Sequence, residues 1–137
     1  MIIIIIKTDI CYYGLIPPNK PQSPSAPTMA EAIAIETWEE FEKNVLHYTG
    51  GRLVVVDYVS ISCGDCIALT PFFVQQVRKF PNVLFYEVDI DDCPEIKNWE
   101  KVKKLPLIKF YRYGKCLETI TEGNTSKITA ALNKHSK

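Results

Sequence analysis

The stretch that decides the fold is Leu53-Val54-Val55-Val56-Asp57-Tyr58-Val59, followed after three residues by Cys63-Gly64-Asp65-Cys66. An apolar, largely β-branched run of this kind predicts a strand that is buried on both faces, as in a parallel sheet. The residues after the second cysteine predict a helix that continues through Val77. The C-x-x-C pair therefore stands between a buried strand and the first turn of a helix.

Strands and helices alternate on both sides of this stretch. Upstream, we expect a short strand over 32–35 and a helix from the capping box Thr37-Trp38-Glu39-Glu40 to His47. Downstream, we expect a strand over 83–88, a short helix starting at Pro94, a hairpin of 107–111 with 116–120, and a last helix capped by Thr125 or Ser126. The order β-α-β-α-β-α-β-β-α predicts an α/β fold with a central mixed five-stranded sheet and helices on both faces. Its first three strands are parallel, and the hairpin adds an antiparallel edge.

The N-terminal residues 1–29 differ in composition from the rest of the chain. They begin with the isoleucine run Ile2–Ile6 and pass into the proline-rich stretch Pro17–Pro27. The isoleucine run is shorter than the roughly 20 apolar residues that span a bilayer, and it lacks the basic start of a secretory signal. We expect a disordered or dispensable leader, a gene-model extension before a start at Met29, and one folded domain over 30–137.

The charge balance and the cysteine count exclude several classes of protein. With 16 basic and 16 acidic residues the formal net charge is zero, which gives no electrostatic support to a nucleic-acid or membrane partner. The five cysteines are odd in number and scattered, unlike the framework of a disulfide-rich secreted domain. Only one pair is close in sequence, whereas a zinc ribbon needs two such pairs.

The position of the C-x-x-C pair indicates redox chemistry. A helix N-terminus offers unpaired N–H groups and the positive end of the helix dipole, so it stabilises the first sulfur as a thiolate. Only the thiolate attacks a disulfide, so Cys63 is the predicted nucleophile. Cys66 lies one turn further on, faces inward, and is predicted to resolve the mixed disulfide. The competing interpretation is that the two cysteines are small apolar residues that fill space at a helix start. It does not explain why they lie between a buried strand and a helix N-terminus.

Asp57 is the second candidate, because it follows four apolar residues in the central strand. A buried carboxyl group without a partner tends to keep its proton, and near the inner sulfur it could accept and return the proton of Cys66. The alternative is a carboxylate at the end of the strand that points into water.

Several separate motifs now resemble a eukaryotic cytosolic thioredoxin over nearly all of residues 30–136. They are Leu53 to Tyr58, Cys63-Gly64-Asp65-Cys66, Pro71-Phe72-Phe73, Asn82 to Cys93, Leu105-Pro106, Gly114 and Gly123. The resemblance implies the thioredoxin fold, Cys63 as nucleophile, Cys66 as resolving thiol and Asp57 as buried proton carrier. It also implies that Pro106 is a cis-proline beside the disulfide, and that a substrate strand aligns with the backbone at Leu105.

The same resemblance implies the cellular setting. We expect a monomeric, cytoplasmic protein-disulfide reductase that needs no bound cofactor or metal and contributes to cell redox homeostasis. Its electrons would come from NADPH through a thioredoxin reductase. They would pass to disulfide-containing proteins such as peroxiredoxin or ribonucleotide reductase.

Three residues depart from the family pattern. Ser62 stands where the family usually has Trp, Asp65 stands in place of Pro between Gly64 and Cys66, and Leu107 follows the proline where Thr is common. The Asp65 carboxylate destabilises a nearby thiolate by on the order of 1 kcal/mol, while the loss of proline loosens the turn, so the net effect on redox potential stays open. These departures favour an alternative function, a thioredoxin-like binding or regulatory module with little general turnover.

The remaining candidates lie around the motif or elsewhere in the fold. Ile61, Leu105 and Gly123 are predicted to form an apolar docking rim. Cys93 is expected to be an exposed thiol that is either idle or regulatory, and Cys116 a small core residue. A metal or iron–sulfur site shared by two chains through the C-x-x-C pair is a third hypothesis.

Overall fold

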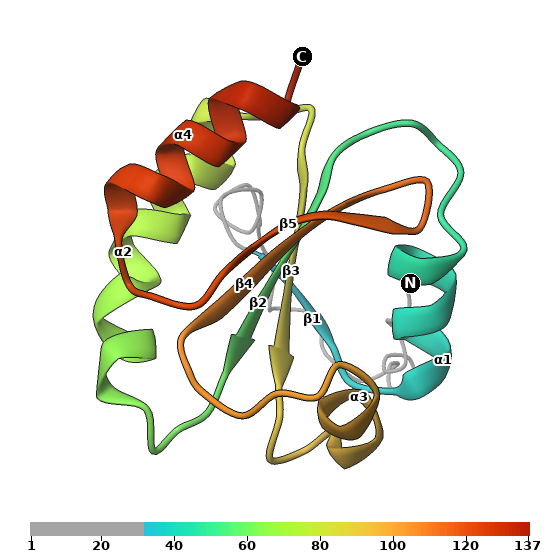
Figure 1. Ribbon diagram of the computed structural model, residues 1–137, viewed down its shortest axis with the longest axis vertical. Coiled ribbons are helices and arrows are strands. Elements are labelled where there is room, and N and C mark those ends of the chain that lie inside the picture. Colours follow the sequence, from blue (N-terminus) through green and yellow to red (C-terminus); the bar gives the residue numbers. More distant parts are fainter. Residues whose placement is uncertain (1–31) are drawn as a thin grey trace, which may run out of the picture. The chain divides into compact units, whose positions relative to one another are not determined.

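The computed structural model describes residues 32–137, which form one unit (Figure 1). The predicted leader, its boundary at residue 30 and Cys11 lie outside the described residues. Within residues 32–137, no helix is both long enough and apolar enough to cross a membrane. The elements are β1 (Ile33–Ile35), α1 (Trp38–Phe41), a π-helical turn η3 (Glu42–Leu46), β2 (Val54–Val59), α2 (Gly64–Lys79), β3 (Leu84–Asp89), α3 (Pro94–Trp99), β4 (Leu107–Arg112), β5 (Lys115–Ile120) and α4 (Thr125–His135).

The helix starts follow from local side-chain chemistry. The capping box at the start of α1 is confirmed, because the Glu40 N–H donates to Thr37 Oγ1 at 3.1 Å and the Thr37 N–H donates to Glu40 Oε2 at 3.2 Å. The predicted cap of α4 is wrong by one residue. Asn124 has extended backbone angles and its Oδ1 accepts from the Lys127 N–H at 3.0 Å, so it supplies the cap in place of Thr125 or Ser126.

The sheet has the predicted mixed topology. Its strand order is β1-β3-β2-β4-β5, in which β1, β3 and β2 run parallel and β4 is antiparallel to both β2 and β5. The hairpin between β4 and β5 turns at Tyr113 and Gly114, both of which have positive φ. A Cβ on Gly114 would lie 2.1 Å from the Leu46 carbonyl oxygen, so the close approach of this turn to η3 requires glycine.

The two faces of the sheet bury two separate cores, as expected for helices on both sides. Figure 1 shows α2 and α4 on one face and α1 and α3 on the other. Alternate residues of β2 serve both cores: Val54, Val56 and Tyr58 pack on the α1 and α3 side, and Val55 packs on the α2 and α4 side. This double burial explains why the strand reads as a continuous apolar run.

Candidate functional site

The C-terminal ends of β2 and β3 point to the same edge of the sheet, where α2 begins and α3 lies (Figure 1). This edge is where parallel α/β sheets place their ligand sites. The C-x-x-C pair follows β2 at this edge, and the loop that enters it is closed by a hydrogen bond from the Cys63 N–H to the Ser60 carbonyl at 3.0 Å.

Cys63 and Cys66 form a disulfide, with their Cα atoms 5.3 Å apart. Cys63 occupies the cap position of α2, and its Sγ accepts the Cys66 N–H at 3.1 Å. Cys63 is partly exposed, whereas Cys66 is only 4% exposed. The helix thus directs a backbone N–H and its positive end at the accessible sulfur, which is the arrangement that stabilises a thiolate there.

Asp57 is buried, which excludes the solvent-pointing alternative. It is 8% exposed, and its Oδ1 has no hydrogen-bond partner among the described residues. It continues the α2-facing side of β2 beyond Val55 and pairs in register with Glu87 on β3 and Ile108 on β4. Burial, and secondarily the Glu87 carboxylate, raise the pKa of Asp57 well above its usual value. Glu87 was not predicted from the sequence, because only the strand register brings it beside Asp57.

The peptide bond between Leu105 and Pro106 is cis, as the resemblance implied. Pro106 is buried, and its Cγ lies 3.7 Å from the position of a Cβ built on Gly123. Gly123 and Leu105 therefore both adjoin Pro106. Ile61 is 83% exposed, and Ile67 on α2, an apolar residue that was not singled out from the sequence, is also exposed.

An open groove of about 610 Å³ lies beside Cys63. The sequence-predicted residues Ser62, Gly64, Asp65 and Leu105 line it, while Ile61 and Gly123 do not. The groove also contains residues that the motif did not indicate. They are Ser60, Ile90, Asp91, Lys97, Val102, Lys103 and Lys104.

Comparison with known proteins identifies this arrangement. Residues 32–134 match the thioredoxin domain family. The chain belongs to the thioredoxin family. It is 38% identical to thioredoxin of Oryctolagus cuniculus over 100 residues, which are 73% of this chain and 94% of that protein. It is 35% identical to thioredoxin of Homo sapiens, with the same coverage. The solved thioredoxin of Fasciola hepatica has a TM-score of 0.71 at 27% identity, and the match covers 75% of this chain and 98% of that one.

Family membership and the Cys63–Cys66 disulfide together assign the activity. The protein is a thiol–disulfide oxidoreductase that acts on protein disulfides. Like thioredoxins in general, it works with disulfide substrates and a reductase partner.

At the position where thioredoxins usually carry Trp, a short chain of hydroxyl groups leads away from the disulfide. Ser62 Oγ lies 2.9 Å from Ser60 Oγ, and the Ser60 hydroxyl donates to Asp91 Oδ2 at 2.5 Å. Ser60 is buried and Ser62 is exposed. With serine at position 62, the loop before Cys63 is hydrogen-bonded to Asp91 through Ser60, and no large side chain at this position covers the groove.

Two thioredoxin-domain cysteines outside the motif are placed opposite to prediction. Cys93 is 5% exposed, not a surface thiol, and its Sγ lies 3.6 Å from the Ile35 carbonyl oxygen within the α1 and α3 core. Burial, followed by nearby carboxylates beginning with Asp92, raises the pKa of Cys93. Cys116 on β5 is exposed, not a core residue.

The burial of Cys93 and the exposure of Cys116 predict which of these two thiols is alkylated first in the oxidised protein. With Cys63 and Cys66 in their disulfide, iodoacetamide should modify Cys116 at least about tenfold faster than Cys93, because alkylation needs an accessible thiolate. Peptide mass spectrometry after timed quenching reads the two sites separately. Equal rates would show that Cys93 is accessible in solution, and labelling in urea supplies the unfolded control.

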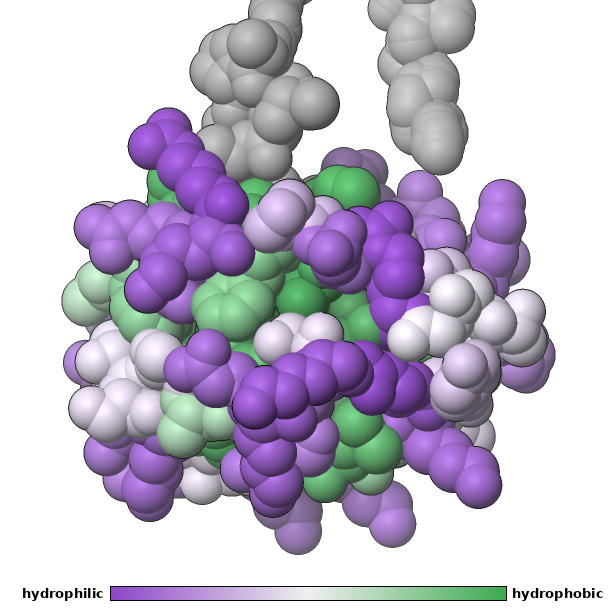
Figure 2. Space-filling view, turned by 90° about the horizontal axis from the view of Figure 1, so that it is seen from above, coloured by the Kyte–Doolittle hydropathy of each residue, from purple (hydrophilic) through white to green (hydrophobic). Residues whose placement is uncertain are grey.

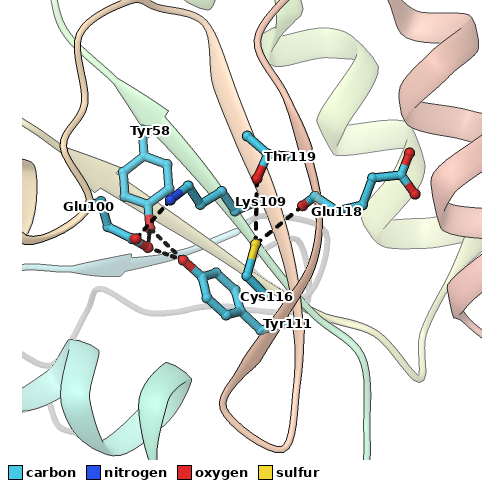
Figure 3. A network of polar contacts seen from close by, with 7 residues as sticks. All are labelled: Tyr58, Glu100, Lys109, Tyr111, Cys116, Glu118 and Thr119. Carbon is cyan, nitrogen blue, oxygen red and sulfur yellow. Dashed lines mark hydrogen bonds and ion pairs between the residues drawn. The ribbon is translucent and has the colours of Figure 1, made fainter.

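A buried polar network holds the end of α3 against the thioredoxin sheet (Figure 3). Glu100 accepts the hydroxyl of Tyr58 at 2.5 Å and that of Tyr111, and its other oxygen pairs with Lys109 Nζ at 2.8 Å. Burial first, and then the Glu100 carboxylate, raise the pKa of Tyr58, so this hydroxyl keeps its proton and donates. The network fixes the start of the segment that runs to Pro106 along the groove.

Proposed function

We propose that this protein is a cytosolic disulfide reductase in which Cys63 attacks the substrate and Cys66 resolves the intermediate. The observation that carries the assignment is the asymmetry of the pair. Cys63 is partly exposed and accepts the Cys66 N–H at 3.1 Å, whereas Cys66 is buried. A protein substrate can reach the first sulfur but not the second.

The proposed exchange has two steps. The Cys63 thiolate attacks one sulfur of a substrate disulfide, so a Cys63–substrate bond forms and the other substrate sulfur leaves as a thiolate. Cys66 then loses its proton and attacks Cys63 Sγ, so the Cys63–Cys66 bond forms and the second substrate thiolate leaves. Two electrons pass from the dithiol to the substrate disulfide, and the leaving thiolates take up protons.

Asp57 is the proposed acceptor of the Cys66 proton. Its burial, its unpartnered Oδ1 and its raised pKa support this role, because such a group exchanges a proton near neutral pH more readily than an ordinary aspartate. The groups nearest along the sheet are Glu87 and Ile108, and neither supplies a cation that would hold Asp57 ionised.

The residues around the pair are assigned positioning and tuning roles. The cis-Pro106 and the Leu105 backbone would align a substrate strand, with Ile61 and Gly123 as apolar contacts. Exposed Asp65 places a carboxylate within the motif, and Gly64 leaves open space beside it. Ser62 widens the approach to Cys63.

The proposed partners follow from the family. Electrons would come from NADPH through a thioredoxin reductase, with no cofactor bound by the chain itself. Peroxiredoxin and ribonucleotide reductase are the proposed classes of target. A reducing cytosol suits a pair that must be re-reduced after each turnover.

The test is reduction of insulin by the full chain, with NADPH and a thioredoxin reductase supplying electrons. We expect NADPH consumption that depends on insulin and is abolished in Cys63→Ser. Circular dichroism of the variant would check that it is folded. If the wild-type protein is folded but gives no turnover above the reductase background, the reductase assignment is wrong, and a binding or regulatory module becomes the better description.

A further inference from the structure

The groove beside Cys63 has one strongly cationic wall. Lys97 on α3 and Lys103 and Lys104 in the segment before Pro106 all line it, and all three are exposed. Asp65 and Asp91 also line the groove. The whole chain has zero formal net charge, so this local excess of lysine is not part of a generally basic surface.

The charges that line the groove are compensated unequally. The Asp91 carboxylate has a hydrogen-bond partner, the Ser60 hydroxyl at 2.5 Å. Among residues 32–137, neither Asp65 nor any of the three lysines forms a salt bridge. Lys127, which pairs with Glu122 at 2.7 Å, is the main cause of that carboxylate's lowered pKa, and Lys104 adds only a minor contribution. The lysine wall therefore keeps most of its capacity to bind an anionic group.

The backbone that carries the lysine wall is fixed. Val102, between Lys101 and Lys103, is buried in the α1 and α3 core, and its N–H donates to the Lys97 carbonyl at 3.0 Å. Glu100 is held by the network of Figure 3, and buried Pro106 anchors the other end. The lysine ammonium groups remain free to adjust while their attachment points stay beside Cys63.

We propose that this protein selects disulfides flanked by acidic residues, whose carboxylates bind Lys97, Lys103 and Lys104 while the disulfide faces Cys63. The proposal rests on the function given above and names its substrate class. Charge complementarity at a partly exposed surface acts mainly on encounter and on choice of partner, and it weakens with salt. Acidic flanks would meet the lysine wall, whereas basic flanks would be repelled by it.

The test uses three disulfide-bonded peptides that differ only in the residues flanking the cystine, which are Glu, Gln or Lys. The pre-reduced full chain donates two electrons to each peptide, and released peptide thiol gives the second-order rate constant. Each value is divided by the rate with dithiothreitol, which removes differences in intrinsic reactivity. At low salt we expect the Glu peptide to react about tenfold faster than the Lys peptide, and the difference to shrink to about twofold at high salt.

Two triple variants of equal charge locate the effect. Lys97→Gln/Lys103→Gln/Lys104→Gln should lose the preference while still reducing the Gln peptide. The matched control Lys43→Gln/Lys79→Gln/Lys115→Gln should keep it. These three lysines lie on η3, at the end of α2 and beside the β4–β5 turn, away from the groove. Figure 2 views the molecule from that end, where hydrophilic side chains cover most of the surface with apolar patches between them.

The outcomes separate the two proposals. If the wild-type protein reduces all three peptides at equal normalised rates, the acidic-substrate proposal is wrong, but the proposed reductase function still stands. A preference that persists in the groove variant, or disappears in the control, would also overturn the acidic-substrate proposal. Reduction of none of the peptides would contradict the reductase function itself. If the groove variant fails to fold, the single variants Lys103→Gln and Lys104→Gln must each reduce the preference for the proposal to stand.

Discussion

Replacing Cys66 by serine should turn the protein into a covalent trap that stops after the first exchange step. Cys63 in this variant still attacks a substrate disulfide, but no second sulfur is present to release it. Multiple turnover should fall by about a thousandfold or more, as expected when a chemically essential group is removed. The partially exposed Cys63 makes the first step possible, and without the Cys66 thiol only an added external thiol can release the substrate.

The measurement is non-reducing electrophoresis after Cys66→Ser is mixed with a disulfide-containing protein, followed by mass spectrometry of the linked peptide. We expect a dithiothreitol-sensitive adduct joined through Cys63. Cys63→Ser is the matched control and should form none, although it differs from the wild type by the same single atom. An adduct through Cys66 in the control would reverse the assignment of the two cysteines.

Asp57→Asn should slow resolution by about a hundredfold near neutral pH, within the usual range for loss of a general base. Asparagine keeps the size of the side chain but cannot accept the Cys66 proton. Stopped-flow measurement of adduct decay isolates this step from the initial attack. The deficit should narrow at alkaline pH, where Cys66 deprotonates without help. An unchanged decay rate throughout the pH range would exclude Asp57 as the proton acceptor.

The same substitution should stabilise the oxidised protein, by on the order of 1–3 kcal/mol at alkaline pH. The pKa of Asp57 is raised in the folded state, so the folded protein holds this proton to higher pH than the unfolded chain does. Stability of the wild type is therefore lost as pH rises from the usual aspartate range through the raised pKa. The advantage of Asp57→Asn should grow over that window and then level off. Urea unfolding at several pH values tests the slope, and an advantage that shrinks with rising pH would contradict it.

The features predicted correctly from sequence are those set by local pattern. The apolar run of β2 serves two cores, so it reads as a buried strand, and the capping box marks the start of α1. The redox role of the C-x-x-C pair could be predicted because it depends on the strand before the pair and the helix after it, and both can be predicted from the local sequence. The cis bond at Pro106 was available only through family resemblance, because a Leu-Pro pair alone favours trans.

The errors concern properties decided by distant contacts or by register. Cys93 follows an acidic turn, but its burial depends on β1, which lies 58 residues earlier. Cys116 is on an edge strand whose pairing shifts at Phe110 and Tyr111. Because a one-residue shift exchanges the two faces of a strand, the alternation of β5 could not assign Cys116 to a side. The lysine wall was missed for a similar reason, since α3 and the segment before Pro106 meet Cys63 only in the folded chain.

In the segment from Glu100 to Pro106, the residues that stabilise the fold are different from the residues that can contact a partner. Glu100, Val102 and Pro106 point inward, while the lysines between and beside them project into solvent. Mutations at the outward positions alter surface charge and leave the core packing intact, so most cost little stability. A gene duplicate could therefore acquire a new set of clients through a few changes here, without first passing through a poorly folded ancestor.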